Sequence, residues 1–193
     1  MTSYKIAILV GSLRKDSLNR RVAQSLCAFA GERLNCDIVE IGNLPLYNQD
    51  SDENPPPEYV AFRDEIGRAD GVLFVTPEYN RGMPGVLKNA IDVGSRPLGK
   101  NVFNQKPAAI VSASPGMIGG AFANHQVRQS AVFLNMPVMQ HPEAYLGRVS
   151  DDSFDEDGCL KEGPLKELII GLATAFGDWV HLILESRSLL AKR

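Results

Sequence analysis

The sequence has few cysteines and no pattern typical of disulfide-rich or zinc-binding proteins. Only Cys27, Cys36 and Cys159 occur among its 193 residues, and no two of them form a C-x-x-C pair. An odd number of cysteines without such pairs argues against a disulfide framework and fits a reducing compartment. The histidines are also too far apart to show metal-ligand spacing; they are His125, His141 and His181.

The sequence also has no large excess of charge of one sign and no long uninterrupted hydrophobic run. The 20 Lys and Arg nearly balance the 23 Asp and Glu, for a net charge of −3, so we expect no nucleic-acid-binding surface. The longest apolar tract, 168–184, is interrupted by Asp178 and His181 and is short for a bilayer span. Met1 leads almost directly into a strand-like segment, unlike a signal peptide. We expect a cytoplasmic protein without membrane insertion.

Two phosphate-binding motifs and a calcium motif are missing as well. There is no G-x-x-x-x-G-K-[ST] of nucleoside triphosphatases, and no G-x-G-x-x-G follows the first strand-like run. The acidic segment 151–158 resembles a calcium loop only superficially. When it is aligned on Gly158, Ser153 takes the first ligand position and Pro164 the last, so the pattern fails. We expect no metal site.

The composition is that of an ordinary globular chain, with 44% apolar and 22% charged residues. Apolar strand-like runs alternate with segments of helical periodicity. Strands are expected at 4–10, 36–41, 71–75, 106–112 and within 137–146, with an interruption near Pro142. Helices are expected from Leu18, over 59–69, from Pro84 to Gly94, through 127–134 and over 165–183. This order predicts one α/β domain over 1–193, a flavodoxin-like doubly wound sandwich whose five-stranded parallel sheet has the order 2-1-3-4-5.

The first loop at the carboxyl edge of this sheet, residues 11–19, has the features of a phosphate site. It offers hydroxyls at Ser12 and Ser17, the Asn19 amide and the Arg14 guanidinium just before a helix N-terminus. Residues 1–24 also carry five cationic side chains against the single aspartate Asp16, which indicates a local basic patch. The simpler alternative is that Ser17 only caps the helix. Because no residue of the loop stands out as a phosphoryl acceptor, we expect the loop to bind a monophosphate without cleaving it.

The second and third loops suggest the rest of the ligand. In 76–84, prolines fix the backbone direction, Tyr79 could flank a planar ring, and Gly82 permits either a close approach or a positive φ. The three glycines of 113–120 leave backbone N–H groups unshielded. Beside a phosphate loop, these features outline a flat ligand with a phosphate tail, which is the shape of flavin mononucleotide (FMN).

Two long segments and the first loop carry a resemblance to a known family. They are GSLRKDSLNRRVA at 11–23, PEYNRGMPGVLKNAID at 77–92 and SASPGMIGGAFANHQVRQ at 112–129, supported by LPLYNQD at 44–50, PVMQHPEAYLG at 137–147 and AFGDWV at 175–180. Together they resemble the NADPH-dependent FMN reductase family, and most closely its quinone, chromate and azo-dye reductase branch. The resemblance covers nearly the whole chain.

The resemblance implies which residues bind the cofactor. The FMN phosphate would be held by Ser12, Arg14, Ser17, Leu18 and Asn19. The isoalloxazine would be lined, mostly through backbone groups, by Pro77, Glu78, Tyr79 and Asn80. Its pyrimidine side would be closed by Ser114, Gly116, Gly119 and Gly120. No catalytic side chain is implied, because the flavin carries the chemistry.

By the same resemblance, the protein would pass hydride from NADPH or NADH through FMN to a small-molecule acceptor by a ping-pong mechanism. The acceptor would be a quinone, chromate, an azo dye or a flavin, and the assembly a homodimer or homotetramer. The sequence departs from the family at 81–83 and at Val93-Gly94, near the expected substrate mouth or subunit contact. Arg81 adds a positive charge that could contact NADPH phosphate or an anionic acceptor. A flavodoxin-like electron carrier and a non-catalytic flavin-binding or signalling module are the alternatives.

Overall fold

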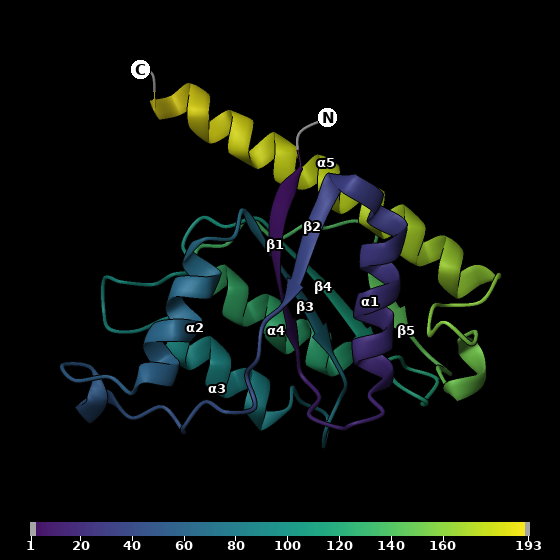
Figure 1. Ribbon diagram of the computed structural model, residues 1–193, viewed down its shortest axis with the longest axis horizontal. Coiled ribbons are helices and arrows are strands. Elements are labelled where there is room, and N and C mark those ends of the chain that lie inside the picture. Colours follow the sequence, from purple (N-terminus) through teal and green to yellow (C-terminus); the bar gives the residue numbers. More distant parts are fainter. Residues whose placement is uncertain (1–2, 192–193) are drawn as a thin grey trace.

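Five parallel strands form one sheet in the order β2-β1-β3-β4-β5 (Figure 1). The computed structural model describes residues 3–191. Its strands are β1 (Tyr4–Val10), β2 (Leu34–Ile38), β3 (Gly71–Thr76), β4 (Ala108–Ala113) and β5 (Ala144–Leu146). The central strands β3 and β4 are buried along their whole length, as expected of a parallel sheet covered on both faces. The predicted fold class and strand order are confirmed.

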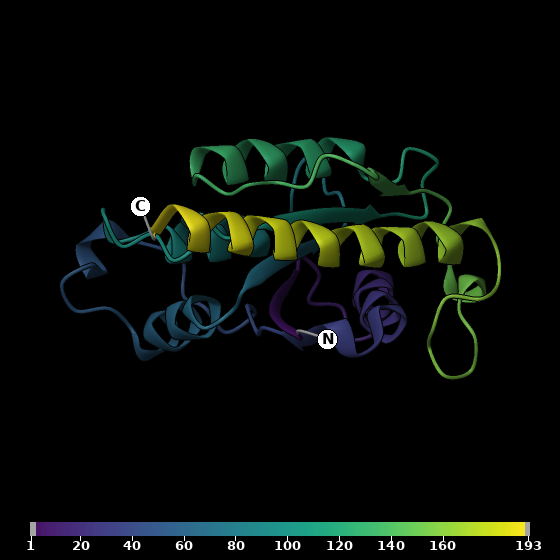
Figure 2. The same cartoon turned by 90° about the horizontal axis from the view of Figure 1, so that it is seen from above.

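Five helices cover the two faces of this sheet. They are α1 (Leu18–Ala30), α2 (Pro57–Gly67), α3 (Gly85–Gly94), α4 (Ala121–Phe133) and α5 (Pro164–Ala191). One buried cluster joins α1 and α5 to the sheet, and a second joins α2, α3 and α4 to the opposite face. Figure 2 shows α1 and α4 on opposite sides of the molecule, with α5 running nearly its full length.

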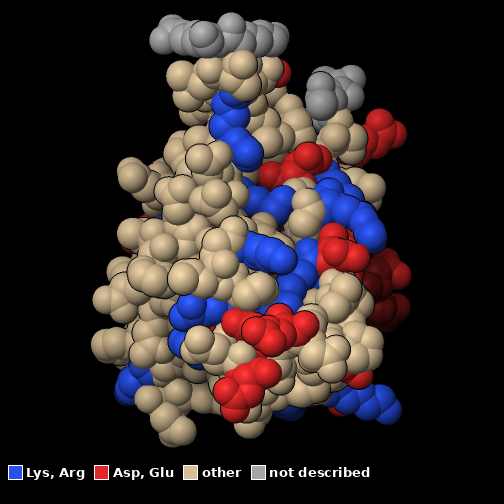
Figure 3. Space-filling model, turned by 90° about the vertical axis from the view of Figure 1, so that its left-hand side faces the viewer, with Lys and Arg blue, Asp and Glu red and all other residues tan. Residues whose placement is uncertain are grey.

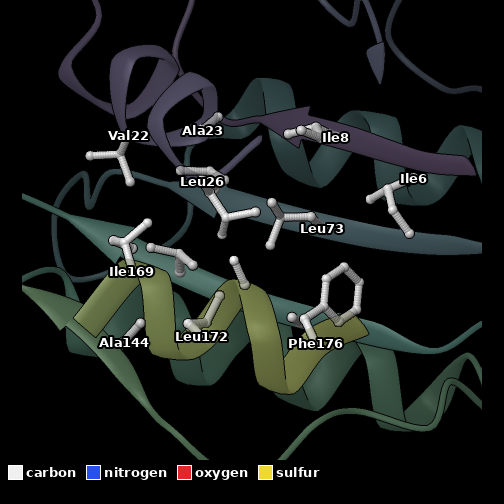
Figure 4. Packing of buried hydrophobic residues seen from close by; sticks show 14 of the residues in the cluster. Ile6, Ile8, Val22, Ala23, Leu26, Leu73, Ala144, Ile169, Leu172 and Phe176 are labelled. Carbon is white, nitrogen blue, oxygen red and sulfur yellow. The ribbon is translucent and has the colours of Figure 1, made fainter. Parts of the chain in front are cut away.

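The core under α1 and α5 is built from side chains at helical spacing. Val22 and Leu26 of α1 meet Ile8 and Leu73 of the sheet, while Ile169, Leu172 and Phe176 of α5 close the cluster from the other side (Figure 4). By length and composition, α5 is a helix that could cross a membrane, with about a third of its most apolar stretch buried. Its buried positions recur along one face that packs on the sheet.

Leu26→Ala should lower the free energy of unfolding by about 2–5 kcal/mol, because Leu26 is fully buried and its truncation leaves a cavity. Chemical denaturation of the purified protein measures the change. Leu13→Ala is the matched control, since Leu13 is 58% exposed and its truncation should cost far less. Similar losses in the two variants would contradict this packing.

The second strand differs from the sequence-based expectation, whereas the fifth agrees with it. The second strand begins at Leu34 rather than at Cys36, because a single short turn follows α1 and Leu34 pairs at once with Tyr4. The fifth strand is interrupted as expected: Val138 bridges to Ala108, and regular pairing resumes only at β5.

The departure at Val93-Gly94 lies in the core. Both residues are buried at the end of α3, so neither presents a side chain at the surface. A side chain on Gly94 would collide with the Phe103 ring, which is itself fully buried. The change at 93–94 is therefore a packing change in the core under α3.

Candidate functional site

The three loops predicted to form the site meet at the carboxyl ends of β1, β3 and β4. The Gly11 N–H donates to the Val75 carbonyl at 2.8 Å, so the first loop starts against the end of β3. A cleft between the loops is lined by Ser12, Arg14, Ser17, Leu18, Asn19, Pro77, Glu78, Tyr79, Ala113, Ser114 and Pro115. Nine of the predicted residues thus share one cleft, whereas Asn80, Gly116, Gly119 and Gly120 stand outside its lining. Sequence reasoning did not single out Ala113 or Pro115.

The first loop presents a helix N-terminus to this cleft. Ser17 is the N-cap of α1, and its hydroxyl accepts from the Arg20 N–H at 3.2 Å. The capping alternative is therefore correct for the Ser17 side chain. The N–H groups of Leu18 and Asn19 follow as the first two of the helix, where no acceptor exists within the helix itself. These two amides, with the positive end of the helix dipole, are suited to an anion.

Asn19 supplies a test of whether the cleft fits a ribityl phosphate. Its Nδ2 donates to the Ala113 carbonyl at 3.1 Å and so ties α1 to the end of β4. Its Oδ1 is buried and has no hydrogen-bond partner within the described part of the chain. A buried acceptor without a donor is costly, and a ligand hydroxyl would satisfy it. The residues therefore fit the hydroxyl-bearing chain of FMN.

The basic patch expected over residues 1–24 is smaller than its sequence suggests. Lys5 lies at the start of β1, about 20 Å along the strand from the first loop, and pairs with Asp37 at 3.6 Å. Arg21 is bonded to Asp151 at 2.9 Å. The exposed Arg14 makes no ion pair among residues 3–191, so it is the cation of the cleft available to a ligand.

Charge is mixed on one face of the molecule. On the face shown in Figure 3, Lys and Arg side chains alternate with Asp and Glu, without a continuous field of one sign. Such a surface gives no general attraction to polyanions on that face.

The second loop ends in a tight turn with two left-handed residues. Tyr79 and Gly82 exchange hydrogen bonds of 2.9 Å in both directions, and Asn80 and Arg81 between them have φ values of 50° and 64°. This is the backbone of a type I′ turn. Of the two alternatives for Gly82, the structure shows the close approach, because a Cβ there would lie 2.9 Å from Oε1 of Gln126. The φ of Gly82 is not positive. The turn leaves Tyr79 54% exposed beside the cleft.

Glu78 fastens this loop to α4. Its Oε2 accepts from the N–H groups of Phe122 and Ala123 at 2.9 and 3.2 Å, and its Oε1 pairs with Arg81 at 3.2 Å. The carboxylate therefore satisfies the N-terminus of α4. Because both carboxylate oxygens are engaged, a ligand at this position would contact the backbone of Glu78.

Glu78→Ala should lower the free energy of unfolding by about 1–2 kcal/mol, because two amides of α4 lose their acceptor. Denaturant unfolding measures it. Arg81→Ala is the control: it keeps both helix contacts and removes an exposed guanidinium from its ion pair with Glu78 and from the Phe122 ring, and this loss should cost about 1 kcal/mol or less. An equal or larger loss in Arg81→Ala would show that the capping contacts are not what holds the loop.

The third loop uses part of its own backbone internally. Ser114 Oγ accepts from the Gly116 N–H at 3.0 Å, and the Gly119 N–H donates to the Gly116 carbonyl at 3.2 Å. Within residues 3–191, the N–H groups of Met117, Ile118 and Gly120 have no acceptor. Of these three residues, only Gly120 is among those that the family resemblance singled out for the cofactor.

Gly119 and Gly120 both adopt left-handed conformations, with φ values of 66° and 75°. A Cβ on Gly119 would lie 2.6 Å from the Tyr145 carbonyl carbon, so β5 approaches the loop closely. These two glycines thus shape the loop whether or not their own atoms contact a ligand.

Comparison with known proteins agrees with this geometry. Residues 4–151 match the family described as "NADPH-dependent FMN reductase". A quinone reductase of Pseudomonas putida strain KT2440 is 55% identical over 180 residues, covering 93% of this chain and 96% of the relative. A 2-hydroxy-1,4-benzoquinone reductase of a Burkholderia species is 42% identical, covering 93% and 97%.

A solved structure shows the same arrangement. FerB of Paracoccus denitrificans, a flavoenzyme NAD(P)H:(acceptor) oxidoreductase, superposes with a TM-score of 0.88 at 38% identity, covering 92% of this chain and 97% of FerB. The family match covers well over half of the chain, and both relatives exceed 40% identity over nearly their full lengths. This chain belongs to the NADPH-dependent FMN reductase family.

Proposed function

We propose that this protein is an FMN-dependent quinone reductase that takes hydride from NADPH or NADH and works by a ping-pong mechanism. The relatives named as quinone reductases support the acceptor class. The observation that carries the proposal is the cleft at the carboxyl ends of β1, β3 and β4, which residues of all three loops line.

The first loop would hold the phosphate end of the cofactor. Arg14 supplies charge, the Leu18 and Asn19 amides supply donors, and the buried Oδ1 of Asn19 accepts from a ribityl hydroxyl. When bound, FMN supplies the acceptor for nicotinamide hydride and then the donor to the quinone.

The other two loops would position the ring. The backbone at 77–80 lines one edge, where the Glu78 bonds to α4 keep it in place. The N–H groups of Met117, Ile118 and Gly120 could hold negative charge that develops on the ring, as preorganised donors do in other active sites. The mechanism requires no side chain to act as a nucleophile.

Arg81 would set a positive charge beside the ring. Its guanidinium stands over the Phe122 ring, 5.4 Å from the centroid, and bonds to Glu78. Held by both groups, it is placed to contact the phosphate of NADPH or an anionic acceptor. We propose the same route of reduction for chromate, azo dyes and free flavin, the further acceptors that the family resemblance implies.

We also propose a homodimer or homotetramer in the cytoplasm. Phe122, Val132 and Phe133 of α4 are 50%, 70% and 86% exposed. Large apolar side chains exposed along one helix favour coverage by another protein surface. Sedimentation velocity on the flavin-loaded protein tests this, and a monomer at micromolar concentration would contradict it.

Steady-state kinetics tests the function. Rates measured against NADPH at several fixed quinone concentrations should give parallel double-reciprocal lines, as expected when the oxidised nicotinamide leaves before the quinone binds. Intersecting lines would contradict the ping-pong mechanism. FMN that NADPH and NADH both leave oxidised would favour a flavodoxin-like carrier, and a protein that cannot take up FMN would favour a non-catalytic signalling module.

A further inference from the structure

Two of the three cysteines meet on the side of the sheet covered by α1. Cys27 lies near the end of α1, and Cys36 is the third residue of β2. Cys36 pairs with Ile6 in the sheet, and both join the cluster under α1 and α5, so its side chain points toward α1. Helix α1 packs against β2, and both cysteines lie against the same buried cluster between them. We propose that Cys27 and Cys36 form a redox-active dithiol that a hydroperoxide converts to a disulfide.

The position of the pair lets a small oxidant reach it. Both cysteines are reduced and only partly buried, and β2 is an edge strand of the sheet. The pair is also separate from the cofactor cleft: Cys27 is eight residues beyond Asn19 on α1, which is about 12 Å along the helix. Neither cysteine lines the cleft.

The two thiols have different pKa values, which gives them different roles. Interaction with the Cys27 thiol lowers the pKa of Cys36, whereas interaction with Cys36, together with burial, raises the pKa of Cys27. Asp37 acts in the opposite sense on Cys36 but more weakly. Because the thiolate is the nucleophile, Cys36 attacks and Cys27 resolves.

The reaction balances in two steps. The Cys36 sulfur attacks one oxygen of hydrogen peroxide; the O–O bond breaks, the peroxide is reduced to water and Cys36 becomes a sulfenic acid. The Cys27 sulfur then attacks the Cys36 sulfur, the S–O bond breaks, and a second water leaves as the disulfide forms. An added dithiol reverses the result by thiol–disulfide exchange.

Intact-mass spectrometry of the FMN-loaded protein, treated with hydrogen peroxide and then alkylated, tests the proposal. The wild type and Cys159→Ser should each lose about 2 Da and keep both pair cysteines from the alkylating reagent, and dithiothreitol should restore both. Cys36→Ser should show no such loss. Cys27→Ser should accumulate a sulfenic acid at Cys36 that dimedone traps.

Three results would overturn the proposal. They are a wild type that gains only oxygen atoms, a loss of about 2 Da that persists in Cys36→Ser, and a disulfide mapped by peptide analysis to Cys159. Flavin absorbance, followed in the same samples, shows whether each variant is folded. Because the readout is the mass of the protein, it does not depend on the proposed quinone reduction.

Discussion

Replacing Arg14 by alanine should raise the dissociation constant for FMN about 10- to 100-fold, because a charge-assisted hydrogen bond is worth about 1.5–3 kcal/mol. Arg14 lines the cleft and makes no ion pair within residues 3–191, so its removal leaves no other charge unpaired. Titration of FMN into the apoprotein, followed by the quenching of flavin fluorescence, gives the constant directly. The stability of the apoprotein should hardly change, since the side chain is exposed.

Arg20→Ala is the matched control for this effect. It removes the same charge six residues further along the chain, in the first turn of α1, from a side chain that does not line the cleft. If the general positive field attracted the phosphate, both variants would weaken FMN binding equally. If Arg14 contacts the phosphate, Arg20→Ala should change the constant less than about threefold at physiological salt. Unchanged affinity in Arg14→Ala would show that the phosphate lies elsewhere.

Gly119→Ala should weaken FMN binding by at least about 100-fold, because the third loop cannot keep its shape with a Cβ at this position. The left-handed backbone alone costs about 1–2 kcal/mol, and the new atom would lie 2.6 Å from backbone of β5. The loop must shift, and the N–H groups of Met117, Ile118 and Gly120 shift with it. Thermal unfolding should show a lower Tm, and FMN titration should show the loss of affinity.

Gly116→Ala tests whether any added side chain in this loop weakens FMN binding, or only one that collides with β5. A Cβ on Gly116 meets only the Ser114 hydroxyl oxygen, at 3.4 Å, which is ordinary contact. We expect its FMN affinity to change less than about tenfold and its Tm to stay close to wild type. Equal losses in both variants would mean that the loop tolerates no side chain, and the specific approach of β5 to Gly119 would not be the cause.

The fold follows largely from local sequence patterns. Apolar runs such as 4–10 and 71–75 can be recognised as strands, and parallel strands joined by helices leave few possible topologies. The start of β2 at Leu34 was less evident, because it depends on pairing with Tyr4 across the sheet. The packing of Phe103 against Gly94 joins two different segments, and no local pattern reports such a contact.

The sequence predicts which loops meet better than it predicts which atoms of those loops are already bonded within the protein. Strand ends placed the three loops together, as the cleft shows. Counting charges overestimated the basic patch, because Asp151 reaches Arg21 from 130 residues further along the chain. The engagement of Glu78 with α4 and of the Gly116 N–H with Ser114 also depends on folded geometry. Residue type indicates which groups are available, but only the structure shows which are already used.

Anaerobic mixing of the FMN-loaded protein with NADPH, followed by a quinone, tests the central claim most directly. The absorption band of oxidised flavin should disappear on mixing with NADPH or NADH and return when one equivalent of quinone is added, with no enzyme-bound nicotinamide needed for the second step. A band that persists with both nucleotides, or that quinone fails to restore, would contradict an FMN-dependent quinone reductase.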